Sequence, residues 1–134
     1  MPSSPLANNK PVAVPGISDA EWTVMREFWA RGEATSADVI ETLLETQSWK
    51  PPTIQTLISR LVKKGALGFT RQGREYLYRP LVAEEDCRHE VSRSFVDRVF
   101  GGKLAPMLSC FLEREKLSAK ELDELRKILE AGNQ

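Results

Sequence analysis

The spacing of apolar residues changes at Gly65, and this change limits the folds open to the chain. Before Gly65, apolar residues follow the spacing i, i+3, i+4, i+7, i+8, which predicts a helix that ends near Lys64 and has one apolar face. That face consists of Ile54, Leu57, Ile58, Leu61 and Val62. After it, Gly73 permits a turn between two segments that favour an extended chain, so residues 67–79 predict strand, turn and strand. We therefore expect a helix followed directly by a β-hairpin.

Two other helical patterns come earlier in the chain. Residues 17–31 begin with a capping box of Ser18 and Glu21 and carry an apolar face of Trp22, Met25, Phe28 and Trp29. Thr35 opens the second pattern, whose buried stripe is predicted to be Val39, Ile40, Leu43 and Leu44. Three helices and then a two-stranded hairpin are the element order of a winged helix-turn-helix domain, in which the third helix enters the major groove of DNA.

Charge is unevenly distributed along the chain. Its 19 basic and 19 acidic residues cancel, and zero net charge by itself argues against a nucleic-acid partner. Residues 50–80, however, contain seven bases against Glu75 alone, a net charge of +6, whereas residues 17–49 carry a net charge of −5. A local basic block of this kind is an electrostatic footprint for DNA that the charge of the whole chain conceals.

The polar face of the third predicted helix has hydroxyl, amide and cationic side chains and no carboxylate. Such side chains reach base edges and phosphates in a major groove. We predict that this helix binds double-stranded DNA through Thr53, Gln55, Thr56, Ser59, Arg60 and Lys63, and that phosphates are held by Lys50, Arg71 and Arg74. Two alternatives stay open: an ordinary solvated helix face, and a winged-helix protein-interaction module whose basic patch meets an acidic protein.

The C-terminal half has more large apolar side chains than three short helices can bury. Because so small a unit has little interior, a second copy of the chain is the most economical partner; packing against the N-terminal domain is the alternative. The predicted homodimer interface comprises Val91, Phe95, Val99, Leu104, Leu108, Phe111, Leu112, Leu122, Leu125 and Leu129. A twofold dimer presents two reading helices, so its DNA site should be an inverted repeat.

These patterns predict a mainly α-helical protein of two domains. Residues 17–82 form the winged-helix domain and residues 83–131 a three-helix dimerisation domain, between a disordered tail at 1–16 and a short tail at 132–134. No apolar run approaches the roughly 18 residues of a membrane span, and no signal-peptide pattern begins the chain. With only two cysteines, we expect a cytoplasmic protein that inserts in no membrane.

Residues suited to catalysis or metal binding are few. His89 is the one histidine, and Cys87 lies two residues from it on a predicted helix, so the two side chains point to different sides. We therefore predict no metal, no cofactor and no enzymatic activity. Cys87 is expected to be a small core residue. An enzyme or redox switch built on Cys87 and Cys110 is the remaining alternative.

Four separated stretches of the sequence match one protein family in order and spacing. They are ISDAEW at 17–22, WKPPTIQTLISRLVKKGAL at 49–67, YLYRPLV at 76–82, and residues 94–102 from Ser-Phe to Phe-Gly-Gly. On these residues the chain resembles the penicillinase repressor family (BlaI/MecI/CopY group) over about residues 17–131. The resemblance implies a dimeric winged-helix repressor that binds inverted-repeat operators, often with TACA/TGTA half-sites, upstream of β-lactamase or related genes.

The resemblance also implies a route to derepression. Family members are inactivated when a membrane sensor-protease triggers cleavage in the C-terminal domain, at an Asn-Phe bond. The aligned pair here is Cys110-Phe111, so the asparagine is missing. A copper-responsive branch carries a C-terminal cysteine cluster, which the ending LRKILEAGNQ does not have, so direct copper sensing is not expected.

Overall fold

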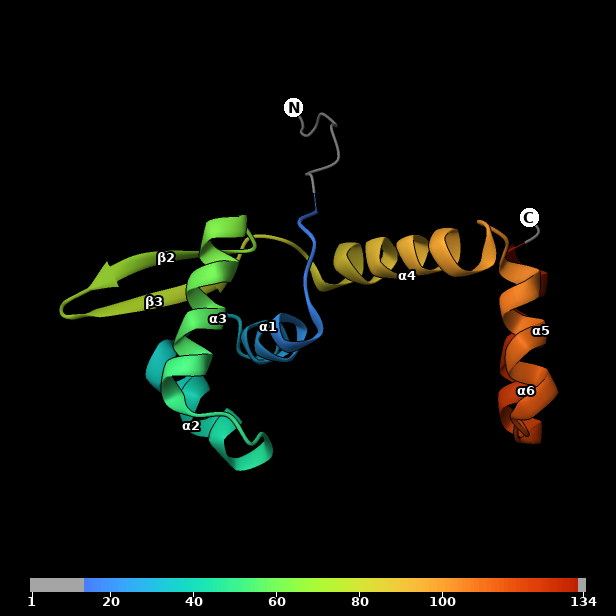
Figure 1. The fold of residues 1–134 in the computed structure, drawn as a ribbon, viewed down its shortest axis with the longest axis horizontal. Coiled ribbons are helices and arrows are strands. Elements are labelled where there is room, and N and C mark those ends of the chain that lie inside the picture. The colour runs from blue at the N-terminus through green and yellow to red at the C-terminus, as the bar shows by residue number, and fades with distance from the viewer. Residues whose placement is uncertain (1–13, 133–134) are drawn as a thin grey trace. The chain divides into compact units, whose positions relative to one another are not determined.

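The computed structural model describes residues 14–132 of the protein, which are mainly helical (Figure 1). All six predicted helices and the predicted hairpin are confirmed. The elements follow in the order α1 (Asp19–Arg31), β1 (Ala34–Thr35), α2 (Ser36–Thr46), α3 (Pro51–Lys64), β2 (Leu67–Gln72), β3 (Glu75–Pro80), α4 (Glu84–Phe100), α5 (Leu104–Arg114) and α6 (Ala119–Gly132).

The chain divides into two compact units inside α4, after Val91. The sequence pattern places a boundary earlier, after Val82, where the hairpin ends and the next helix begins. The first two turns of α4 stay with the first unit because Cys87, at the end of the first turn, is fully buried in its core.

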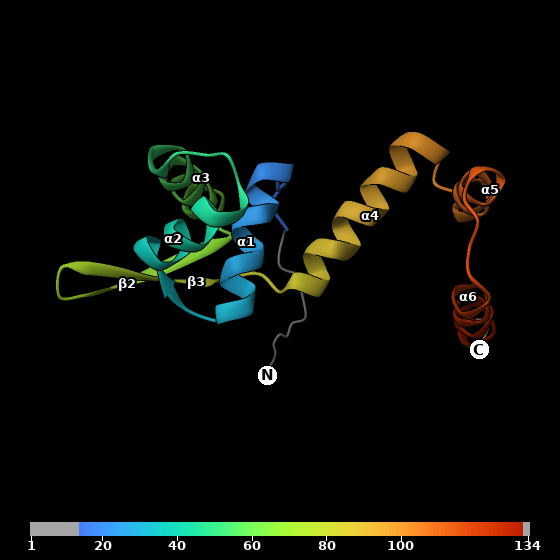
Figure 2. The ribbon, with the colours of Figure 1, turned by 90° about the horizontal axis from the view of Figure 1, so that it is seen from below.

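A three-stranded antiparallel sheet, in the order β1-β3-β2, belongs to the first unit. β2 and β3 pair in a register that sets Phe69 opposite Tyr78, and Gly73 adopts φ +64° in the turn between them. A positive φ favours glycine, which explains why the turn falls here. The resulting hairpin projects beyond the helices of its unit (Figures 1 and 2). β1 has two residues, too few for the alternation that predicts a strand, so the sequence pattern does not reveal it.

The core of the first unit lies between α1, α2, α3 and the sheet. The predicted apolar faces supply most of it, because the buried side chains include Met25, Phe28, Val39, Leu43, Ile54, Leu57, Ile58 and Leu61. Leu44 was predicted to join the buried stripe of α2 and is instead exposed. It lies about 100° around the helix from Leu43, which carries it past the edge of the buried face.

The chain before α1 also packs on the first unit. Val14 and Ile17 are half-buried against the core, and the Gly16 carbonyl accepts a hydrogen bond from Lys64. The stretch expected to be a disordered tail therefore has an end, residues 14–16, that contacts the domain. Residues 1–13 of that predicted tail, and residues 133–134, lie outside the described residues.

The second unit comprises the end of α4, together with α5 and α6, and it buries little. Val96 is buried, and Arg93 closes the turn after α4 by donating hydrogen bonds to the Asp97 carboxylate and the Gly102 carbonyl. Neither α5 nor α6, as far as the structure describes them, contains a buried residue. Within residues 14–132, no helix has the length and apolar character needed to cross a bilayer.

Candidate nucleic-acid interface

α3 separates its side chains into a buried and an exposed side. Ile54, Ile58 and Leu61 have no exposed surface. The residues predicted to face DNA lie away from the core: Gln55 is half-buried, and the exposed members are Thr53, Thr56, Ser59, Arg60 and Lys63. The same helix therefore fixes itself in the core with one face and presents hydroxyl groups and cations with the other.

The first turn of α3 needs no acidic cap. Lys50 is the N-cap residue, its side chain makes no capping hydrogen bond, and the turn contains no acid. Pro51 and Pro52 have no backbone N–H to satisfy, and the Thr53 N–H donates to the Lys50 carbonyl at 3.0 Å. A capping carboxylate would repel phosphate, and the two prolines make one unnecessary. The exposed Lys50 thus stands at the positive end of the helix dipole.

Two polar side chains of the predicted interface are already oriented by short-range hydrogen bonds. The Thr56 hydroxyl donates to the Pro52 carbonyl at 2.9 Å, so its oxygen remains an acceptor on the exposed face. At the hairpin tip, Arg71 Nε donates to the Gly73 carbonyl at 3.0 Å. Arg71 and Arg74 are both exposed, which places two cations at the end of the projecting hairpin.

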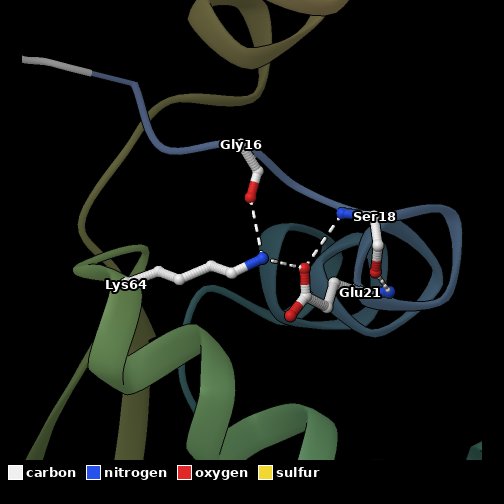
Figure 3. Close-up of polar contacts among 4 residues, drawn as sticks. All are labelled: Gly16, Ser18, Glu21 and Lys64. Carbon is white, nitrogen blue, oxygen red and sulfur yellow. Dashed lines mark hydrogen bonds and ion pairs between the residues drawn. The ribbon is translucent and has the colours of Figure 1, made fainter.

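Two adjacent lysines at the end of α3 have different surroundings. Lys64 Nζ donates to the Gly16 carbonyl at 2.8 Å and to the carboxylate of Glu21, which is only 2% exposed (Figure 3). The same carboxylate accepts a hydrogen bond from the Ser18 amide at 2.9 Å, which completes the predicted capping box. Lys63 is exposed and forms no ion pair within the part of the chain that the structure describes. Lys63, and not Lys64, is thus the cation free to meet a phosphate.

The Lys64–Glu21 ion pair keeps a buried carboxylate charged. Burial alone would raise the pKa of Glu21, because it disfavours the charged form, but hydrogen bonds from Lys64 and Ser18 outweigh it and lower the pKa below its ordinary value of 4.5. Sequence reasoning gave Glu21 only its capping role. The two partners lie 43 residues apart, and no local spacing signal connects them.

The side chains weighed for chemistry do not come together. Cys87 is fully buried, and burial, with the nearby charges of Asp86 and Glu84, raises the pKa of its thiol. Such a thiol is a poor nucleophile and metal ligand. His89 and Cys110 are exposed. Among the described residues, no three His, Cys, Asp or Glu side chains are grouped to hold a metal ion.

The apolar side chains predicted for a dimer interface are largely uncovered. The exposed members are Val91, Phe95, Val99, Leu104, Phe111, Leu112, Leu122 and Leu129. Leu108 and Leu125 are half-buried and line an open groove of about 350 Å³ whose other apolar walls are Phe111, Leu112 and Leu117. Ile128 is 64% exposed and was absent from the predicted interface, although it continues the apolar stripe of α6.

Known proteins resemble the chain over most of its length. The sequence model that describes penicillinase repressors matches residues 17–131. The chain belongs to the penicillinase repressor family. The penicillinase repressor of Bacillus licheniformis is 43% identical over 117 residues, 87% of this chain and 91% of that protein. The methicillin resistance regulatory protein MecI of Staphylococcus aureus (strain N315) is 38% identical over 113 residues, 84% of this chain and 92% of that one.

A solved structure of the family supports the fold of the first unit. The solution structure of the Bacillus licheniformis BlaI monomeric form, in complex with the blaP half-operator, is 43% identical to this family member and superposes with a TM-score of 0.50. The match covers 55% of this chain and 90% of that chain. The winged helix-turn-helix fold predicted from the element order is therefore confirmed.

Proposed function

We propose that the protein represses transcription by binding an inverted-repeat operator as a homodimer. As a member of the penicillinase repressor family, it is a DNA-binding transcriptional repressor. The observation that carries the finer proposal is that an exposed face without carboxylates on α3 accompanies a large uncovered apolar surface on α4, α5 and α6. The first surface binds DNA and the second binds another copy of the chain.

In this proposal α3 lies in the major groove of the operator. Thr53, Gln55, Thr56 and Ser59 supply hydrogen-bonding groups toward base edges, and Arg60 and Lys63 extend along the groove to bases and phosphates. Lys50 at the helix start, and Arg71 and Arg74 at the hairpin tip, hold the DNA backbone. Neutralising phosphates with these cations releases counterions, so binding should weaken steeply as salt rises.

The dimer follows from the apolar surface of the second unit. Monomeric soluble proteins rarely expose contiguous apolar patches larger than a few hundred Å². Here α5 and α6 leave Leu104, Phe111, Leu122, Ile128 and Leu129 more than two-fifths exposed. A second copy offers the same side chains for mutual burial, and the resulting twofold symmetry places two copies of α3 about 34 Å apart, one turn of DNA or a multiple of it.

Derepression is proposed to act by removing part of this interface, with a membrane sensor-protease as the partner that triggers it. Cleavage at the Cys110–Phe111 bond would detach residues 111–134, which hold five of the ten predicted interface residues. The bond lies inside α5, so a protease can reach its backbone only after that turn of the helix unwinds. Loss of the dimer then removes the second half-site contact.

Sedimentation equilibrium and gel shifts on three duplexes test the proposal. The duplexes carry a TACA/TGTA inverted repeat, a single half-site, and a scrambled sequence. We expect a dimer that binds the repeat at least about 100-fold more tightly than the half-site, because the second contact is nearly intramolecular. A chain ending at Cys110 should be monomeric and should retain half-site binding.

Two results would contradict the proposal. A stable monomer that binds all three duplexes equally would remove both the dimer and its operator preference. Weak, salt-insensitive binding to every duplex would instead favour an acidic protein as the partner of the basic face. Catalysis has no part in the proposal, so Cys110→Ser should leave operator binding unchanged.

A further inference from the structure

The three residues that connect β3 to α4 are held against the first unit. The Leu81 N–H donates to the Ala66 carbonyl at 2.9 Å, and the Val82 side chain is buried in the core. The Val82 carbonyl accepts a hydrogen bond from the indole Nε1 of Trp29, at 2.9 Å. Figure 2 shows this connection passing from β3 beside α1 into the start of α4. The connection therefore has little freedom to move.

Trp29 is itself fixed in orientation by its neighbours. It packs half-buried against the core, and its ring meets the ring of Trp22 edge to face, with centroids 5.2 Å apart. Both tryptophans belong to α1, the helix whose Phe28 and Met25 lie fully buried. The indole N–H is thus aimed at Val82 from a rigid element 53 residues earlier in the chain.

α4 continues the connection without a break. Its first turn begins at once, with the Cys87 N–H donating to the Ala83 carbonyl at 3.1 Å, and Cys87 has no exposed surface. The helix runs 17 residues without glycine or proline, which is about 25 Å at the ordinary rise per residue. Phe95 and Val99, two members of the predicted dimer interface, lie on its later turns. α4 therefore begins in the first unit and contains residues of the predicted dimer interface.

We propose that Trp29 is a positioning residue that selects operators by the number of base pairs between their two half-sites. This inference rests on the proposed function, because spacing matters only to a dimer that holds both half-sites. One added base pair moves a half-site by about 3.4 Å and rotates it by roughly 34°. When the Trp29–Val82 hydrogen bond holds residues 81–83, this segment resists the displacement. When the bond is lost, the segment can adjust to the new half-site position.

Gel shifts with the full-length protein test the proposal on inverted repeats whose half-sites are separated by a series of spacings. The wild-type protein should prefer one spacing. Trp29→Phe keeps an aromatic ring but lacks the N–H, and its preference for that spacing over a repeat lengthened by one base pair should fall by about two- to tenfold, the range expected for one lost hydrogen bond. Affinity for an isolated half-site should not change.

Trp22→Phe is the matched control. It makes the same substitution in the other member of the ring pair, keeps an aromatic ring beside Trp29, and removes no group that bonds to Val82. We expect it to retain the wild-type spacing profile. Cys87→Ala provides a second route to the same end, because it weakens the packing of the first α4 turns and should broaden the profile without touching the indole.

A wild-type spacing profile in Trp29→Phe would overturn the proposal, whatever the profile of Cys87→Ala. So would an equal loss of half-site and full-site affinity in Trp29→Phe, because that pattern reports damage to the DNA-binding unit itself. If the wild-type protein does not bind the repeat better than a half-site, the homodimer proposal fails first, and the spacing role falls with it.

Discussion

α3 and α6 have the same length, 14 residues each, and both carry apolar residues at helical spacing. α3 buries Ile54, Leu57, Ile58 and Leu61, whereas α6 buries nothing within the described chain. The difference lies in what surrounds each helix, since α1, α2 and a sheet cover α3 within one chain. Apolar spacing thus predicts that a helix has a face to bury, and it does not say whether the covering surface belongs to the same chain or to another.

The sharpest test of this difference compares matched leucines. Leu61→Ala in α3 empties a fully buried site and should lower the free energy of unfolding by about 2–5 kcal/mol at any protein concentration. Leu129→Ala in α6 alters a side chain that is 53% exposed in the single chain. The loss of stability in Leu129→Ala should appear only at protein concentrations at which the protein is dimeric. Urea unfolding of both variants, at low and high protein concentration, measures the contrast; a concentration-independent loss in Leu129→Ala would contradict it.

A charge placed on the uncovered apolar face of the second unit should weaken dimerisation and leave half-site DNA binding unchanged. Leu122→Asp puts a carboxylate into the proposed interface, and dimer dissociation should be favoured by about 2–4 kcal/mol, or roughly 30- to 1,000-fold. Lys120→Asp introduces the same carboxylate, with a larger change of charge, at an exposed polar position of the same helix and serves as the control. Sedimentation measures both variants. Half-site binding should survive in each, and a fully dimeric Leu122→Asp would place the interface elsewhere.

The two units also contain one motif in two environments. Ser18 and Glu21 form a complete capping box whose carboxylate is buried against Lys64. Ser118 accepts from the Glu121 amide in the same way, but Glu121 is exposed. Glu21→Gln should therefore lower the free energy of unfolding by about 1–3 kcal/mol, and Glu121→Gln by less than about 0.5 kcal/mol. Equal losses would show that capping alone, and not the ion pair, accounts for the contribution of Glu21.

The Lys64–Glu21 ion pair should make the stability of the protein depend on pH. The folded-state pKa of Glu21 lies below its ordinary value, so protons bind the unfolded chain more readily and the contribution of Glu21 is fully present above pH 4.5. That contribution is lost as the pH falls through the lowered folded-state pKa. Thermal unfolding of the wild-type protein and Glu21→Gln, at a series of pH values below 5, should show the two stabilities converging as the solution becomes more acidic.

The residues that sequence patterns located are those whose role depends on local spacing. The faces of α1 and α3, the capping box at Ser18 and the turn at Gly73 each follow from residues within one helical or hairpin repeat. The Lys64–Glu21 ion pair and the Trp29–Val82 hydrogen bond join residues 43 and 53 positions apart, and only tertiary packing brings them together. Leu44 and Ile128 mark the limit of periodicity even within a helix, because the width of a buried face depends on its neighbours.

The smallest expected effect is a difference between Lys63 and Lys64 in the salt dependence of DNA binding. Lys63→Ala removes an exposed charge from the proposed DNA face, and the slope of log affinity against log salt should fall by about 1, with weaker binding to every sequence. Lys64→Ala removes a charge already committed to Glu21 and Gly16, so stability should fall while the salt slope stays unchanged. Titrations of one duplex at several salt concentrations measure both. A lower slope in Lys64→Ala than in Lys63→Ala would mean that DNA draws Lys64 out of its ion pair, and the end of α3 would then rearrange on binding.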